Sequence, residues 1–148
     1  MIGAPSAVPG VGAAEPGTLV MVLVTSSCHM LNSKVLSEVP GVAGIVDGGI
    51  LPGMFGYETG QAAVGDAFAW LRRLLGLVSF ESIAVAARQL PPGAEGVQCV
   101  DWMNGCRNPL MCGALRGECT CQGLGHGPQN VYWALREASR FGLRCIGQ

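Results

Sequence analysis

Glu58 is the residue whose setting most suggests chemistry. It is the first acid in the glycine-studded stretch Gly48–Leu71, GGILPGMFGYETGQAAVGDAFAWL, and it comes just before Gly60. A carboxylate accepts hydrogen bonds, and neighbouring glycines let a backbone come close to a ligand. Alternatively, an acid ahead of a helix that begins near Gly60 would be favoured by the positive end of the helix dipole. The residue pattern leaves both roles open.

The hydroxyls of Thr25 and Ser26 form a second polar group, at the end of an apolar run. The run Thr18–Thr25, TLVMVLVT, is rich in Val and typical of a strand buried on both faces. Two shorter strands are expected, at residues 44–46 before an Asp-Gly-Gly turn and at residues 97–100. Residues 103–128 have the composition of an extended loop.

Three helices are expected to support these elements. Apolar residues recur at helical spacing after Gly60, and Gly76 ends this helix. Residues 79–90 predict a second helix, which Pro91-Pro92-Gly93 terminates. The third begins near Pro128, and its core-facing stripe is Val131, Ala134, Leu135, Ala138 and Phe141. Strands and helices that alternate in this way indicate an α/β fold.

Composition restricts the classes of partner. Apolar residues make up 49% of the 148-residue chain and charged residues 13%, with a formal net charge of −1. We therefore expect no nucleic acid and no anionic membrane as partners, whereas apolar surface made for a neighbouring protein is expected. The longest apolar run, Leu19–Val24, is far short of the roughly 20 residues of a membrane helix, and no signal peptide follows Met1. The expectation is a soluble, cytoplasmic protein.

Seven cysteines stand at positions 28, 99, 106, 112, 119, 121 and 145. An odd number without a secretion signal argues against a disulfide framework. The only close pair is Cys119-Thr-Cys121, followed by His126, and structural zinc sites usually have two such pairs with wider spacing. Reduced, scattered thiols are therefore expected, and no metal site.

Four stretches in a fixed order give the sequence a family resemblance. They contain the TLVMVLVTSSCHML run, the loop around Glu58, the segment DWMNGCRNPLMCGALRG and the last helix, at residues 18–31, 42–71, 101–117 and 126–146. In these stretches the chain resembles the FGGY carbohydrate kinases and, within that family, the kinases that act on L-ribulose. The second stretch is the most specific, because its glycines, Pro52, Tyr57, Glu58, Gln61, Asp66 and Trp70 all match.

The resemblance implies phosphoryl transfer from ATP, with Mg²⁺, to a hydroxyl of a sugar such as L-ribulose. The family has two actin-like, ribonuclease-H-like domains that close around sugar and nucleotide. Residues 18–148 correspond to part of the second, C-terminal domain, and residues 1–17 to a flexible remnant of the domain junction. The expected fold is thus an incomplete actin-like α/β domain.

The family pattern also implies roles for individual residues. Glu58 and Gln61 correspond to sugar-binding positions. Thr25, Ser26 and Arg107 correspond to positions that contact nucleotide phosphates, where turn amides and hydroxyls can face phosphate oxygens. The alternatives are hydroxyls that only cap local backbone and an Arg in a solvated loop. No catalytic residue and no metal ligand is assigned.

Departures from the family pattern bear on activity. Val24 replaces a Gly, Cys112 replaces an Asp, and the position of the general-base Asp falls near Ala4, with no Asp before Asp47. Loss of a general base typically costs 10²–10⁴-fold in rate, and the chain is expected to lack the family's first domain and its final nucleotide-gripping loop. The isolated chain is therefore expected to be inactive.

Three hypotheses remain open. The chain is a segment of a sugar kinase; or it is a non-catalytic module that binds a sugar or nucleotide; or it is a structural partner of a separate kinase domain or of a second copy of itself.

Overall fold

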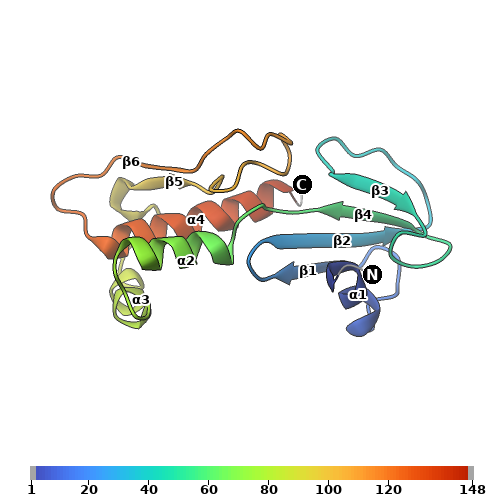
Figure 1. Cartoon of the computed structure of the whole chain (residues 1–148), viewed down its shortest axis with the longest axis horizontal. Coiled ribbons are helices and arrows are strands. Elements are labelled where there is room, and N and C mark those ends of the chain that lie inside the picture. The colour runs from blue at the N-terminus through green and yellow to red at the C-terminus, as the bar shows by residue number, and fades with distance from the viewer. Residues whose placement is uncertain (1–2, 147–148) are drawn as a thin grey trace.

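The structure is a computed structural model that describes residues 3–146. Two halves lie side by side in it (Figure 1). The sheet half, residues 3–61, holds one helix and a four-stranded sheet. The helical half, residues 62–146, holds three helices and a two-stranded ribbon.

The sheet is antiparallel throughout. Its strands are β1 (Leu19–Leu23), β2 (Ser27–Ser33), β3 (Gly44–Asp47) and β4 (Phe55–Thr59), in the spatial order β1-β2-β4-β3. Strands and helices therefore do not alternate in this half, because four strands follow one another along the chain.

β1 is an edge strand, and its burial differs from the prediction. Leu19, Met21 and Leu23 are 48%, 53% and 52% exposed, so the run is not buried on both faces. An edge strand has a neighbour on one side only, and within residues 3–146 nothing fully covers this face of β1. The apolar run is therefore apolar surface rather than core.

Along the outer edge of β1, the backbone N–H and C=O groups face no neighbouring strand of the described sheet. The N–H of Ser27 donates to the carbonyl of Gln61 at 3.0 Å, so the odd-numbered residues of β2 bond to β4 and the even-numbered ones to β1. In the β1–β2 register, odd-numbered residues lie opposite odd-numbered residues and even-numbered residues opposite even-numbered ones. The residues of β1 that direct their N–H and C=O groups toward the open edge are consequently Leu19, Met21 and Leu23.

The start of the chain is more ordered than expected. Helix α1 spans Gly3–Gly10, where the composition predicted a flexible segment. Val8 is fully buried, and α1 contacts β1 and β2. Packing of Val8 against the sheet provides the anchor that the Gly/Ala/Pro composition did not indicate.

The three predicted helices are confirmed in the helical half. They are α2 (Gly65–Leu74), α3 (Glu81–Ala87) and α4 (Pro128–Ile146). Gly76 takes a φ of +63° and its N–H donates to the carbonyl of Arg73, so it ends α2 as predicted. A single turn of 3₁₀ helix, η1 (Ala94–Gly96), precedes the next strand.

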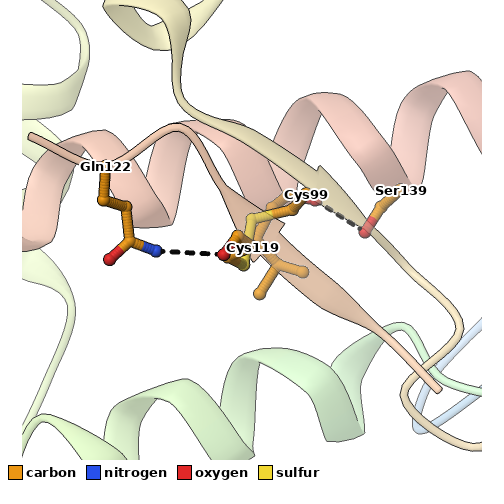
Figure 2. The surroundings of a disulfide bond; sticks show 5 residues. Cys99, Cys119, Gln122 and Ser139 are labelled. Carbon is orange, nitrogen blue, oxygen red and sulfur yellow. Dashed lines mark hydrogen bonds between the residues drawn. A yellow bond between two sulfur atoms is a disulfide. The ribbon is translucent and has the colours of Figure 1, made fainter.

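Strand β5 (Gln98–Val100) is confirmed, but its partner β6 (Glu118–Thr120) lies inside the predicted loop. Cys99 and Cys119 face each other across this ribbon and form a disulfide, so the prediction of reduced thiols is wrong for this pair. Figure 2 shows the disulfide next to Ser139 of α4, and the side chain of Gln122 donating to the carbonyl of Cys119 at 3.4 Å.

Two apolar core clusters lie in the helical half, and the sheet half buries Val8, Met30 and Tyr57. The fully buried members of the two clusters come from α2 and the loop before it, from α4 and from the η1–β5 segment: Ala63, Ala67, Leu71 and Leu135 in one cluster, and Ala94, Val97 and Ala134 in the other. Phe68, Phe80 and Tyr132 pack against the first cluster and against one another. Phe141, predicted to face the core, is 67% exposed, whereas the next residue, Gly142, packs against Gln61 and Asp101.

Candidate functional site

Glu58 lies on β4 and faces a cavity. Its side chain lines a space of about 150 Å³ together with Pro5 of α1, Met30, Gly44 and Arg107, among others. Helix α2 does not begin until Gly65, so Glu58 does not cap a helix. The alternative that Glu58 is favoured by a helix dipole is therefore excluded.

Arg107 is the direct partner of Glu58. Its Nη2 atom lies 2.5 Å from Oε1 of Glu58, and its Nη1 atom lies 3.7 Å from Sγ of Cys28. Burial alone would lower the pKa of the Arg107 guanidinium, but the hydrogen bond and negative charge of Glu58, with a smaller contribution from Cys28, raise it. Glu58, which was expected to bind the sugar, and Arg107, which was expected to contact nucleotide phosphates, thus form one partly exposed ion pair.

Asn108 holds this part of the site together and was missed by the sequence analysis. Its Oδ1 accepts the N–H of Gly60 at 2.9 Å, and its Nδ2 donates to the carbonyl of Gly41. The side chain is 6% exposed. The only signal in the sequence was its place between Arg107 and Pro109, which does not indicate contacts 48 and 67 residues away.

The glycines near Glu58 have an internal reason. A Cβ on Gly60 would lie 2.0 Å from the carbonyl oxygen of Ser27, and one on Gly65 would lie 2.2 Å from that of Val24. Both glycines therefore permit the close approach of one chain segment to another, rather than the approach of a ligand. At these two positions, close packing between chain segments accounts for the glycine.

Gln61 points away from the cavity of Glu58. Its Nε2 donates to the Asp101 carboxylate and to the Ser139 carbonyl, the latter at 3.0 Å, and its Oε1 accepts from Ser27 Oγ at 3.3 Å. Gln61 is 5% exposed, so its amide atoms already serve internal contacts that join the two halves. Its role toward a substrate stays a prediction.

A second cavity, of about 280 Å³, lies beside Gln61. Asp101, Trp102, Cys106 and Phe141 contribute to its lining. Burial raises the pKa of the Asp101 carboxyl, although the hydrogen bond from Gln61 and a backbone hydrogen bond oppose the rise. The structure thus separates Glu58 and Gln61, which the sequence analysis grouped as one site.

The Thr25–Ser26 corner connects β1 to β2 and meets the start of α2. The carbonyl of Thr25 accepts the N–H groups of Val64 and Asp66 at 2.8 and 3.1 Å, and the carbonyl of Val24 accepts that of Gly65 at 3.0 Å. Backbone carbonyls, not hydroxyls, thus cap α2. Within residues 3–146 the hydroxyls of this corner donate no hydrogen bond to the protein.

The Thr25–Ser26 corner comes directly before β2, and Glu58 lies on β4, which pairs with β2. Gln61 pairs with Ser27 next to the corner, and Glu58 is three residues earlier on β4, a separation of about 10 Å along the strand. Val24 does not take a positive φ, so its Cβ is not strained there. Pro5, next to the expected position of the general base at Ala4, lines the cavity of Glu58.

Comparison with known proteins gives this arrangement a family. Residues 19–147 match the model described as "FGGY family of carbohydrate kinases, C-terminal domain". The chain belongs to the FGGY family. Its C-terminal-domain match includes the corner, Glu58 and the Arg107 loop, and the resemblance deduced from the sequence is confirmed.

Ribulokinases are among the relatives of this FGGY chain. It is 42% identical to the ribulokinase of Geobacillus thermodenitrificans and 41% identical to that of Halalkalibacterium halodurans, over 98% of the chain and 28% of each relative. The xylulose kinase of Rhodospirillum rubrum matches with a TM-score of 0.78 and 24% identity, over 95% of the chain and 28% of that structure. The chain spans little more than a quarter of these proteins, and the expected partial α/β domain of actin-like type is confirmed.

No helix among the described elements of residues 3–146 is long and apolar enough to cross a membrane. In the same part of the chain, no group of three or more His, Cys, Asp or Glu side chains could hold a metal ion.

Proposed function

We propose that the chain is a segment of an ATP-dependent sugar kinase of the ribulokinase type. In this proposal Glu58 accepts hydrogen bonds from the hydroxyls of a ketopentose such as L-ribulose. The carrying observation is that the Glu58 carboxylate lines a cavity with Arg107 and with the end of α1 where the family's general base is expected. A carboxylate already paired with one guanidinium keeps lone pairs for hydroxyl donors.

The nucleotide phosphates would lie at the Thr25–Ser26 corner, whose hydroxyls have no partner in the described part of the chain. Mg²⁺ is commonly held by one or two carboxylates together with substrate phosphates. Asp66, whose backbone N–H donates to the Thr25 carbonyl, is the acid whose backbone lies at the corner, and its carboxylate would be the protein ligand of such an ion. Bound there, Mg²⁺ would neutralise charge on the transferred phosphoryl group.

For Arg107 we propose a role that differs from the expected contact with a nucleotide phosphate. We propose that it orients the Glu58 carboxylate for the sugar, instead of contacting a phosphate, since its guanidinium lies 2.5 Å from that carboxylate. Gln61 would position the strand that carries Glu58 through its bonds to Ser27 and Ser139.

Calorimetric titration with L-ribulose tests the sugar site. We expect heat of binding with the native chain and about tenfold or greater weakening in Glu58→Gln, because hydrogen bonds to a charged group contribute about 1.5–3 kcal/mol. Asp47→Asn, which also removes one negative charge from this sheet, is the matched control and should bind normally. Equal binding by both variants would contradict the role of Glu58.

Catalysis by this chain is tested separately, with a coupled assay of ADP release and several ketopentoses. We expect no turnover, because no Asp occurs near Ala4, where the family resemblance puts the general base. Sugar binding without turnover would favour the alternative of a non-catalytic sugar- or nucleotide-binding module. Clear turnover would overturn the expectation of inactivity.

The open β1 strand favours a further partner. Its three exposed apolar side chains and its unpaired edge lie on a chain that spans 28% of its relatives' length. We propose that additional kinase polypeptide covers this surface, with a second copy of the chain as the alternative. Sedimentation of the purified chain separates them: a dimer indicates the second copy, and a monomer that binds a separately produced remainder of a ribulokinase supports the first.

A further inference from the structure

The 105–113 segment folds back on itself at two cysteines. The N–H of Cys106 donates to the carbonyl of Cys112 at 2.9 Å, and the N–H of Cys112 donates to the carbonyl of Cys106 at 2.8 Å. Two residues that exchange both backbone hydrogen bonds form an antiparallel pair with their Cα atoms about 5.5 Å apart and their side chains on the same face. That separation lies within the range of about 4.4–6.8 Å that a disulfide spans.

The backbone next to this pair is held equally close. A Cβ on Gly105 would lie 2.8 Å from Cα of Gly113, so the two chain segments leave no room for a side chain at that position. Both sulfurs are free thiols in the structure. Cys112 stands at a position where the family resemblance implies an Asp.

The residues between the two cysteines include Arg107 and Asn108. Arg107 pairs with Glu58, and Asn108 binds the N–H of Gly60. The Cys106 thiol also donates to the carbonyl of Asn108 at 3.2 Å. A bond between the cysteines would therefore close a covalent ring that contains Arg107 and Asn108, the two residues whose side chains connect this loop to β4 and the residue after it.

We propose that Cys106 and Cys112 are a modification site, at which a reversible disulfide fixes the 106–112 loop against β4. The oxidant is a low-molecular-weight disulfide such as oxidised glutathione. Cys112 is partly exposed and Cys106 is 2% exposed, so Cys112 reacts first.

The chemistry is a pair of thiol–disulfide exchanges. The Cys112 thiolate attacks one sulfur of the small disulfide, which breaks its S–S bond and releases the first small thiolate. The Cys106 thiolate then attacks Sγ of Cys112 and releases the second. In total the two cysteine thiols lose two protons and two electrons, and one small disulfide becomes two small thiols.

Peptide mapping of the full-length native chain tests the proposal. The chain is incubated with oxidised glutathione without denaturant, its remaining thiols are alkylated after unfolding, and the cross-linked peptides are identified by mass spectrometry. We expect Cys106 joined to Cys112, with free thiols falling by two from the five at Cys28, Cys106, Cys112, Cys121 and Cys145. Dithiothreitol should restore both thiols while the circular dichroism stays that of the folded protein.

Two variants make the result specific. Cys112→Ser should abolish the new cross-link, whereas Cys145→Ser should keep it. Cys145 is the control because it lines the same cavity as Cys106 and is the competing partner. The disulfide should also slow tryptic cleavage after Arg107. Joining of Cys106 to Cys145, or alkylation of both Cys106 and Cys112 after oxidation, would overturn the proposal, and neither outcome depends on sugar binding.

Discussion

The helical half and the sheet half bury apolar side chains to different extents. Both core clusters, the packed aromatic rings of Phe68, Phe80 and Tyr132, and the disulfide lie in the helical half. The sheet half exposes one face of β1, buries Val8, Met30 and Tyr57, and makes polar contacts that include the Arg107–Glu58 pair. The helical half thus buries more of its apolar side chains, whereas the sheet half leaves apolar surface open along β1.

Removal of a core side chain should give the largest effect. Leu135→Ala, at a fully buried position of α4, is expected to lower the free energy of unfolding by about 2–5 kcal/mol. Met21→Ala on β1, at 53% exposure, is the matched substitution in the sheet half and should cost about 0.5 kcal/mol. Denaturant unfolding measures both, and similar losses would mean that β1 is as well packed as α4.

Loss of the disulfide is expected to rank next. Cys119→Ser opens a link between residues separated by 20 positions and should cost about 3 kcal/mol. The change is measured as a fall in melting temperature under non-reducing conditions. Cys121→Ser removes an exposed free thiol from the same segment and should leave the melting temperature unchanged; equal falls in the two variants would show that the ribbon does not depend on the disulfide.

Asn108→Ala tests the contact between the halves. The variant leaves the buried N–H of Gly60 without an acceptor, which should cost about 1–3 kcal/mol. Asn104→Ala, at an exposed position of the same loop, is the control. Chemical denaturation compares them, and a neutral Asn108 variant would indicate that water replaces the lost acceptor.

The sheet half should also respond to acid. Burial lowers the pKa of His29 on β2 below its ordinary value of 6.5. The unfolded chain therefore binds the proton first, so stability is complete above pH 6.5 and is lost as the pH falls toward the folded-state pKa.

The slope of this loss cannot exceed about 1.4 kcal/mol per pH unit for a single proton. His29→Gln should flatten the curve of unfolding free energy against pH below pH 6.5, and His126→Gln is the control. An unchanged slope in the His29 variant would assign the acid sensitivity to other groups.

The helices were predictable because their signals are local. The spacing of Val64, Phe68 and Leu71 and the stop at Gly76 lie within a few turns of α2, and the stripe of α4 is similarly regular. The strands β2 and β4 were missed because His29, Asn32 and Gly56 interrupt any apolar alternation. β2 and β4 are strands because they pair with each other and with β1 and β3, and this pairing is not indicated by their own sequences.

The sequence named candidate residues, whose roles stay predictions, but did not indicate how these residues are arranged. The family pattern pointed to Glu58, Gln61 and Arg107, but the Arg107–Glu58 pair joins residues 49 positions apart. Likewise, the disulfide depends on β6, three residues inside a loop-like segment. Contacts of this range arise from the folded topology and leave no periodic signal in the sequence.

Native-state hydrogen exchange measures the contrast between the halves directly. Amides near Leu135 in α4 should exchange only through global unfolding, and those of Val20 and Val22, bonded to β2, through local opening. The outward amides of Leu19, Met21 and Leu23 should exchange fastest. Protection of these three outward amides as strong as that of α4 in the isolated chain would contradict an open sheet half.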